Sequence, residues 1–230
     1  MARTAILVDG GFYRRKYAKG DEHSAQEAAD ALVGYCRRHL HEHTRDHDLY
    51  RIFYYDCTPC GKKIFHPLLN RTIDFSRTSH YSWMNQFLKE LTKKRKVALR
   101  LGTLDEGSAT FVLTERATKD IVMKKRTVDE LTERDFTSSI KQKGVDMKIG
   151  MDIASLAYKK QVEQIVLIAG DADFVPAAKL ARREGIDFVL DPLEHAIKDD
   201  LFEHIDGKRS CGDPYTGKRI IDKREPALTK

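Results

Sequence analysis

Two apolar segments that each end at an aspartate constrain the fold of this chain more than any other feature. The first is Ala5-Ile-Leu-Val8 before Asp9, and the second covers residues 164–170 before Asp171. Apolar runs without polar alternation are typical of parallel strands that are covered on both faces. In open α/β sheets, ligands bind beyond the carboxyl ends of such strands. We therefore expect both aspartates to face one crevice at the edge of a sheet.

Strand and helix patterns alternate along the chain. This alternation predicts an α/β fold, a doubly wound or Rossmann-like sandwich with a mainly parallel central sheet. Strand patterns cover residues 4–9, 51–56, 97–104, 164–170 and 187–190, and helix patterns cover residues 28–36, 83–91, 146–157, 175–184 and 193–205.

The length of 230 residues suits one domain, which we place at residues 1–205. The pattern weakens at residues 105–140, which we interpret as an insertion; residues 110–113 and 120–125 could pair there as a hairpin. Residues 206–230 are polar and basic, and they predict a tail that is mobile unless it docks on a partner.

The composition predicts a soluble protein, with 33% charged and 41% hydrophobic residues. No apolar run approaches the roughly 20 residues that span a bilayer. The chain also enters its first strand too early to leave room for a signal peptide. We therefore expect no membrane association and a cytoplasmic location.

Cysteine and histidine patterns give weaker signals. Cys57-Thr-Pro-Cys60 with nearby His66 has the spacing of a zinc knuckle, but a second closely spaced pair is missing. We interpret this stretch as a loop with reduced thiols. The histidine-rich residues 38–43 and the later His47 predict an exposed helix end and loop.

The aspartates instead favour chemistry based on a hard cation. The chain lacks Gly-x-Gly-x-x-Gly and Gly-Lys-Ser/Thr, and Gly11 stands where a haloacid-dehalogenase-type phosphatase has its second Asp. Carboxylates that converge without partners repel one another, and a divalent cation relieves that repulsion. This pattern indicates metal-assisted hydrolysis of a phosphodiester by Asp9, Asp146, Asp171 and Asp173. Taken alone, Asp146 and Asp173 suit helix N-caps better than a metal site. Asp152 suits either a site role or a structural hydrogen bond, and Asp56 and Asp191 also follow strands.

Basic residues suggest a polyanionic partner. The formal net charge is +6, and the excess is clustered at residues 14–16, 93–96, 124–126 and 182–183. Solvated helix ends would give the same pattern. Two clusters begin near the acids, and they predict RNA contacts by Arg14, Arg15, Lys179 and Arg182. Phe12, Tyr13 or Phe174 could stack a base.

Three motifs in order resemble those of the NYN domain family of PIN-like ribonucleases. They are Ile-Leu-Val-Asp-Gly-Gly (6–11), Lys-Gly-Val-Asp-x5-Asp-Ile (143–153) and Ala-Gly-Asp-Ala-Asp-Phe-Val-Pro (169–176). The resemblance, over residues 3–192, implies a PIN-like three-layer sandwich and a Mg²⁺- or Mn²⁺-dependent endoribonuclease. The family's metal-site acids would fall on Asp9, Asp146, Asp171 and Asp173, with the helix acid on Asp152. Phe12 departs from the pattern, because many relatives carry Asn there.

Two other interpretations stay open. A non-catalytic RNA-binding or regulatory module would keep the fold without turnover, and Phe12 favours it. A DNA nuclease or a phosphatase could use the same acids, since phosphodiester chemistry does not distinguish the sugar. The sequence does not indicate the natural RNA or the oligomeric state.

Overall fold

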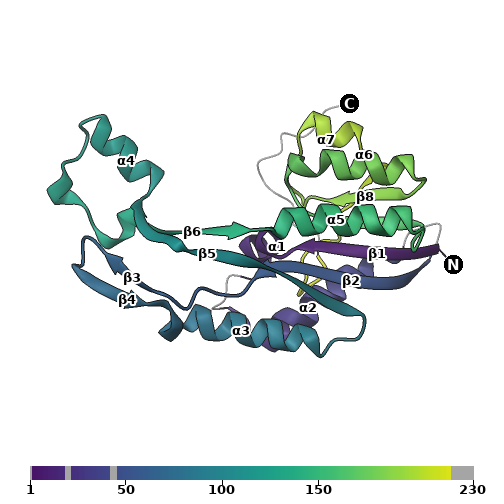
Figure 1. The fold of residues 1–230 in the computed structure, drawn as a ribbon, viewed down its shortest axis with the longest axis horizontal. Coiled ribbons are helices and arrows are strands. Elements are labelled where there is room, and N and C mark those ends of the chain that lie inside the picture. The colour runs from purple at the N-terminus through teal and green to yellow at the C-terminus, as the bar shows by residue number, and fades with distance from the viewer. Residues whose placement is uncertain (1, 19–21, 42–45, 219–230) are drawn as a thin grey trace.

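The central feature of the fold is a seven-stranded sheet in the order β6-β5-β2-β1-β7-β8-β9 (Figure 1). The computed structural model describes residues 2–18, 22–41 and 46–218. Neighbouring strands are parallel except for the antiparallel pair β5–β6, which confirms the predicted α/β class. The strands are β1 (Ala2–Asp9), β2 (His47–Cys57), β5 (Val97–Leu113), β6 (Phe136–Lys143), β7 (Gln164–Ile168), β8 (Asp187–Asp191) and β9 (Gly207–Lys208), and a separate hairpin holds β3 (Lys63–His66) and β4 (Arg71–Asp74).

Helices cover both faces of the sheet and complete a three-layer sandwich (Figure 1). One layer contains α1, α2 and α3, and the other contains α5, α6 and α7. Pro176 lies in the first turn of α6, and Gly185, with φ of 81°, follows its end. The helices are α1 (Gly10–Tyr17), α2 (Ala25–Arg38), α3 (Ser79–Thr92), α4 (Glu115–Val122), α5 (Val145–Tyr158), α6 (Val175–Arg183) and α7 (Asp199–Glu203), with 3₁₀ turns η1 (Phe75–Arg77), η2 (Val128–Glu130), η3 (Glu133–Asp135) and η4 (Ala172–Phe174).

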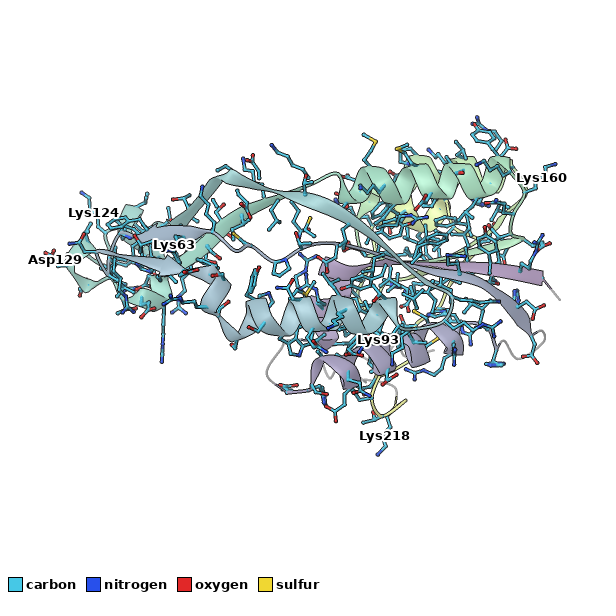
Figure 2. The ribbon with its side chains drawn as sticks, turned by 60° about the horizontal axis from the view of Figure 1, so that its bottom comes forward. Lys63, Lys93, Lys124, Asp129, Lys160 and Lys218 are labelled. Carbon is cyan, nitrogen blue, oxygen red and sulfur yellow. The ribbon has the colours of Figure 1, made fainter. Side chains whose placement is uncertain are left out.

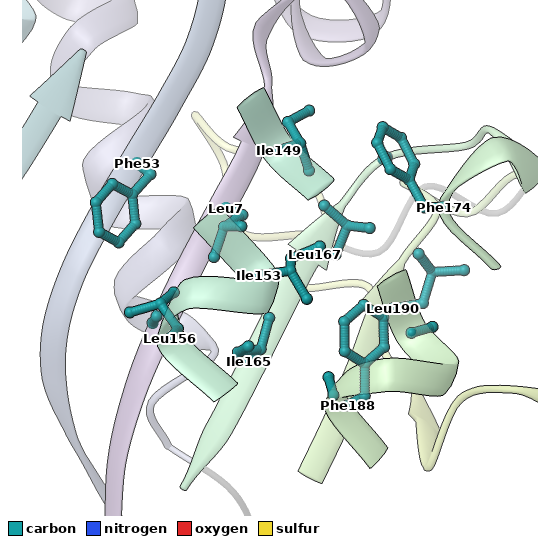
Figure 3. Close-up of a cluster of buried hydrophobic side chains, with 14 of the residues drawn as sticks. Leu7, Phe53, Ile149, Ile153, Leu156, Ile165, Leu167, Phe174, Phe188 and Leu190 are labelled. Carbon is teal, nitrogen blue, oxygen red and sulfur yellow. The ribbon is translucent and has the colours of Figure 1, made fainter. Parts of the chain in front are cut away.

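Alternate residues of the buried strands supply the two cores. Leu7 packs with α5 and α6, whereas its neighbours Ile6 and Val8 pack with α1, α2 and α3. Leu167 lies on the Leu7 side, as Figure 3 shows. Because both faces are covered, these strands are apolar throughout, and this is why the sequence pattern reveals them.

Residues 103–143 form an arm that projects from the sandwich (Figure 1). The predicted pairing of residues 110–113 with 120–125 is wrong: residues 110–113 pair with 136–139 of β6, and residues 115–122 form α4. Thr114 begins α4, because its hydroxyl accepts the N–H of Ala117. The β3–β4 hairpin packs against this arm, where the His66 ring of β3 lies 4.4 Å from the Phe111 ring. Figure 2 shows Lys63 and Lys124 at the arm and Lys160 at the opposite end of the molecule.

The predicted exposed end of α2 is wrong at His39. The side chain of His39 is fully buried, and its Nε2 lies 2.9 Å from Oδ2 of Asp191. His47 is also buried and lies 2.9 Å from the Thr4 hydroxyl, whereas His41 is exposed. The remainder of the histidine-rich stretch, residues 42–45, lies outside the described residues.

The described part of the predicted tail, residues 206–218, docks on the domain itself. Residues 207–208 extend the sheet as β9, and Arg209 donates to the carbonyls of Arg38, His39 and His41. Residues 219–230 lie outside the described residues. The helix expected at residues 193–205 is restricted to α7, because Leu193 and Glu194 have φ of 50° and 66°, outside the right-handed helical region.

Candidate active site at the carboxyl ends of the strands

Asp9 lies where β1 passes into α1. Its Oδ1 accepts the N–H of Phe12 at 3.0 Å, so this aspartate is the N-cap of α1. Burial raises the pKa of Asp9, and the Asp146 and Asp56 carboxylates raise it further, whereas the Phe12 N–H and the Arg15 charge lower it. Asp9 is therefore a half-buried carboxylate that neighbouring acids make harder to ionise.

Asp171 follows the neighbouring strand β7 and caps η4. Its Oδ1 accepts the N–H of Asp173 at 3.1 Å. Val8 and Ile168 are partners in the β1–β7 ladder. Because the strands are parallel, Asp9 and Asp171 leave the sheet at the same edge.

The helix α5 contributes Asp146 to the same group of acids. It lies in the first turn of α5, whose N-cap is Gly144 at φ of 80°. Burial raises the pKa of Asp146, and the charges of Asp171 and Asp173 add to this effect. The alternative prediction that Asp146 and Asp173 act as N-caps is wrong; the strand-end acids Asp9 and Asp171 make the capping bonds instead.

The charges of neighbouring acids therefore add to burial in raising the pKa values of Asp9 and Asp146. Asp146 connects Asp9 on one side with Asp171 and Asp173 on the other. Across residues 2–18, 22–41 and 46–218, no three carboxylates are close enough to share one cation in this conformation. The arrangement is an open acidic edge rather than a closed metal cage.

Comparison with known proteins assigns the chain to a family. A family model described as the NYN domain matches residues 69–203, more than half of the chain. The chain belongs to the NYN domain family. Members of this family are generally PIN-like nucleases. The matched range contains Asp146, Asp171 and Asp173, while β1 and Asp9 precede it.

Other comparisons add little. A crystal structure of a protein of unknown function from Vibrio parahaemolyticus is similar over 93% of this chain and 94% of that chain, at 13% identity and a TM-score of 0.48. A search of curated proteins found no match. In the described part of this NYN domain, no helix combines the length and apolar character needed to cross a membrane.

Asp152 is not brought to the other acids. Its Oδ2 accepts the Tyr55 hydroxyl at 2.7 Å and the Nε–H of Arg100 at 3.0 Å. Tyr55 and Arg100 are partners in the β2–β5 ladder, so α5 places this carboxylate above the sheet. The structure favours the structural hydrogen bond that the sequence left as an alternative.

Asp56 is an acid of this edge to which the sequence gave little weight. It is fully buried near the end of β2, where it accepts Nε–H and Nη2–H of Arg14 at 2.8 and 3.0 Å. Tyr54 donates its hydroxyl to Asp56 at 2.9 Å. A Cβ on Gly10 would lie 2.6 Å from Oδ2 of Asp56 and 2.5 Å from the Tyr54 hydroxyl, so this packing requires glycine.

The partner of Asp56 corrects the prediction for Arg14. Its guanidinium is committed to Asp56, and its side chain is 16% exposed. We therefore assign Arg14 as an anchor of α1 on β2 rather than a contact for RNA. Arg15 is exposed, and its charge acts on Asp9, as expected of a cation beside the acids.

Arg182 does not lie beside the acids, where the sequence prediction placed it. The helix α6 begins beside the acids but runs back along the sheet, and Arg182 pairs with Asp206 at 2.8 Å. Asp206 accepts the N–H of Phe188 near the start of β8. Arg182 therefore lies toward the opposite edge of the sheet, where Lys179 lines a hollow with it.

Gln142 and three aromatic side chains complete the description of the edge. Gln142 on β6 lies near Gly11, since a Cβ there would be 3.9 Å from its Oε1 and 3.4 Å from Oδ1 of Asp9. The sequence missed Gln142 because β6 has no apolar alternation. Tyr13 and Phe174 are 1% and 2% exposed and cannot stack a base, whereas Phe12 is partly exposed.

Proposed function

We propose that this NYN domain is a metal-dependent endoribonuclease that uses Mg²⁺ or Mn²⁺. The observation that supports the proposal is the electrostatic coupling of Asp9, Asp146, Asp171 and Asp173 at the carboxyl edge of the sheet. The family assignment agrees, since NYN domains are generally nucleases. RNA is the proposed partner, and the proposed location is the cytoplasm.

The donor set suits a hard divalent cation. Ionised carboxylates offer only acceptor oxygens, the ligands that Mg²⁺ and Mn²⁺ prefer. A bound cation would lower the pKa of a bound water and neutralise charge that develops on the phosphate oxygens. It would also offset the repulsion between carboxylates, which adds to burial in raising the pKa values of Asp9 and Asp146.

The chain supplies orientation and charge at this edge. Asp9 and Asp171 are each held by a backbone N–H, which fixes one oxygen and leaves the other available. Arg14 neutralises Asp56, so that this acid adds less repulsion to the group. Arg15 supplies an exposed cation for a substrate phosphate.

A non-catalytic RNA-binding or regulatory module is the second candidate. Phe12 favours it, because an apolar ring occupies the position at which many relatives carry an amide. A Cβ on Gly170 would lie 2.5 Å from Cε2 of Phe12, so the ring packs directly before Asp171. The edge also presents no triad of carboxylates gathered for one ion within the described residues.

Cleavage of matched RNA and DNA oligonucleotides tests the proposal. We expect purified protein to cut RNA with Mn²⁺ or Mg²⁺ and to lose activity in EDTA and in Asp171→Asn. Asp129→Asn serves as the charge-matched control, since Asp129 is an exposed acid of the arm. RNA binding without cleavage would favour the second candidate, and preferential cutting of DNA would assign the site to a DNA nuclease.

A further inference from the structure

We propose that a hollow between α1 and the loop after β8 binds one unstacked base of single-stranded RNA beside the acids. This inference rests on the proposed function, because it takes RNA as the ligand. The hollow has a volume of about 490 Å³ and is lined by Phe12, Arg15, Lys16 and His195. Ligand pockets typically measure about 300–1,000 Å³, so a nucleotide fits; we call it the Phe12 hollow.

Phe12 ties the hollow to the acidic edge. It lies three residues after Asp9, and its backbone N–H holds that carboxylate. Its ring packs on Gly170, the residue before Asp171; any side chain there would displace the ring. One wall of the Phe12 hollow therefore lies between the strand ends that carry Asp9 and Asp171.

His195 forms the second aromatic wall. Its ring centroid lies 5.7 Å from that of Phe12, with the ring planes tilted by 60°. The loop that carries it contains Leu193 and Glu194 at φ of 50° and 66°. Such left-handed residues are strained and persist where the surroundings enforce them.

Hydrogen bonds enforce this loop conformation. The N–H of Leu193 donates to Asp191 at 2.8 Å, and the N–H of Glu194 donates to the Ser210 hydroxyl at 2.9 Å. Lys16 donates to the carbonyl of Leu193 and so joins the loop to α1. The two walls of the Phe12 hollow are therefore preorganised, which reduces the entropic cost of binding.

The charges around the hollow suit a nucleotide. Arg15 and Lys16 place cations at its rim. The neighbouring acid Glu194 faces inward: both its carboxylate oxygens are buried, and its charge helps burial to raise the pKa of Tyr17. Aromatic walls with a cationic rim bind single strands by base stacking and phosphate contacts. Paired bases in a duplex do not offer free faces, so the inferred ligand is single-stranded.

Binding of fluorescent single-stranded RNA to the full chain in EDTA tests the inference without requiring cleavage. Phe12→Leu and His195→Ala should each weaken binding by about 5- to 150-fold, the range expected for loss of one base–aromatic stack. Tyr158→Leu is the matched control, since Tyr158 is 63% exposed at the end of α5 remote from the acids. Melting curves of all variants show whether the fold is retained. Because His195 is exposed, His195→Ala removes no buried side chain and should leave the fold intact.

An abasic scan locates the base. We expect the wild-type protein to bind one abasic oligonucleotide, with the base missing at one particular position, more weakly than the intact oligonucleotide. The Phe12→Leu protein should bind that abasic oligonucleotide and the intact one with the same affinity. Wild-type affinity in both Phe12→Leu and His195→Ala, or no binding of RNA by wild type, overturns the inference.

The outcomes also separate this inference from the proposed function. RNA cleavage that requires Asp171 but shows wild-type affinity in both variants would reject the Phe12 hollow and keep the nuclease. Stacking-dependent binding without cleavage would keep the hollow and reject the nuclease.

Discussion

Replacing Arg14 by alanine should destabilise the fold by about 3–5 kcal/mol, the cost of leaving one partner of a buried ion pair without the other. The structure supports this magnitude, because Asp56 is fully buried and loses two hydrogen bonds of 2.8 and 3.0 Å. For a chain of this size, each kcal/mol changes the Tm by about 2–4 °C. We therefore expect a decrease of about 6–20 °C. Arg15→Ala is the matched control, and its exposed side chain predicts a change within about 0.5 kcal/mol.

Urea denaturation gives the free energy of unfolding, and an unchanged m value would show that the denatured state is the same. In a double-mutant cycle, Arg14→Met with Asp56→Asn should destabilise less than the sum of the single changes, by about 0.5–3 kcal/mol. If the Arg14→Ala protein is as stable as the Arg15→Ala protein, this reasoning is refuted. Arg14 would then again be a candidate for contact with RNA.

Three further predictions concern ionisation and metal. Asp9→Asn should raise the Tm at neutral pH: the raised pKa of Asp9 means that its ionisation opposes folding, and Asn keeps the cap. Melting curves across a pH series measure this gain in Tm. It should vanish below the ordinary carboxyl pKa of about 3.9 and grow as pH rises through the raised pKa of Asp9. Millimolar Mn²⁺ should raise the wild-type Tm by preferential binding to the native state, and an unchanged Tm would count against a preformed site. Burial alone lowers the pKa of His39, but its hydrogen bond with Asp191 raises it to about 9. The stability from this pair should be complete below about pH 6.5 and lost as pH rises through 9, and a His39→Gln protein should lack that dependence in the same melts.

The buried strands and the position of their acids are predictable from sequence for a physical reason. A strand covered on both faces must be apolar throughout, so β1 and β7 appear as uninterrupted runs. Parallel strands then bring the residues after them to one edge. The strand pattern alone therefore places Asp9 and Asp171 at the same edge of the sheet.

The features that sequence reasoning missed depend on contacts between distant segments. Arg14 and Asp56 are 42 residues apart, and His39 and Asp191 are 152 residues apart. Neither pair leaves a local pattern, because a buried arginine or histidine has the same sequence signature as an exposed one. The docking of residues 207–208 as β9 also leaves no local pattern, because two residues are too few to show the period of a strand.

The single-turnover rate of RNA cleavage in saturating Mn²⁺ tests the central claim most directly, when measured for individual aspartate-to-asparagine variants. We predict that Asp9→Asn, Asp146→Asn and Asp171→Asn each lower the rate by about 100-fold or more. Asp152→Asn should lower it less, because Asp152 binds Arg100 and Tyr55 rather than joining the acidic edge. Wild-type rates in the three edge variants would contradict the claim that these acids perform the reaction.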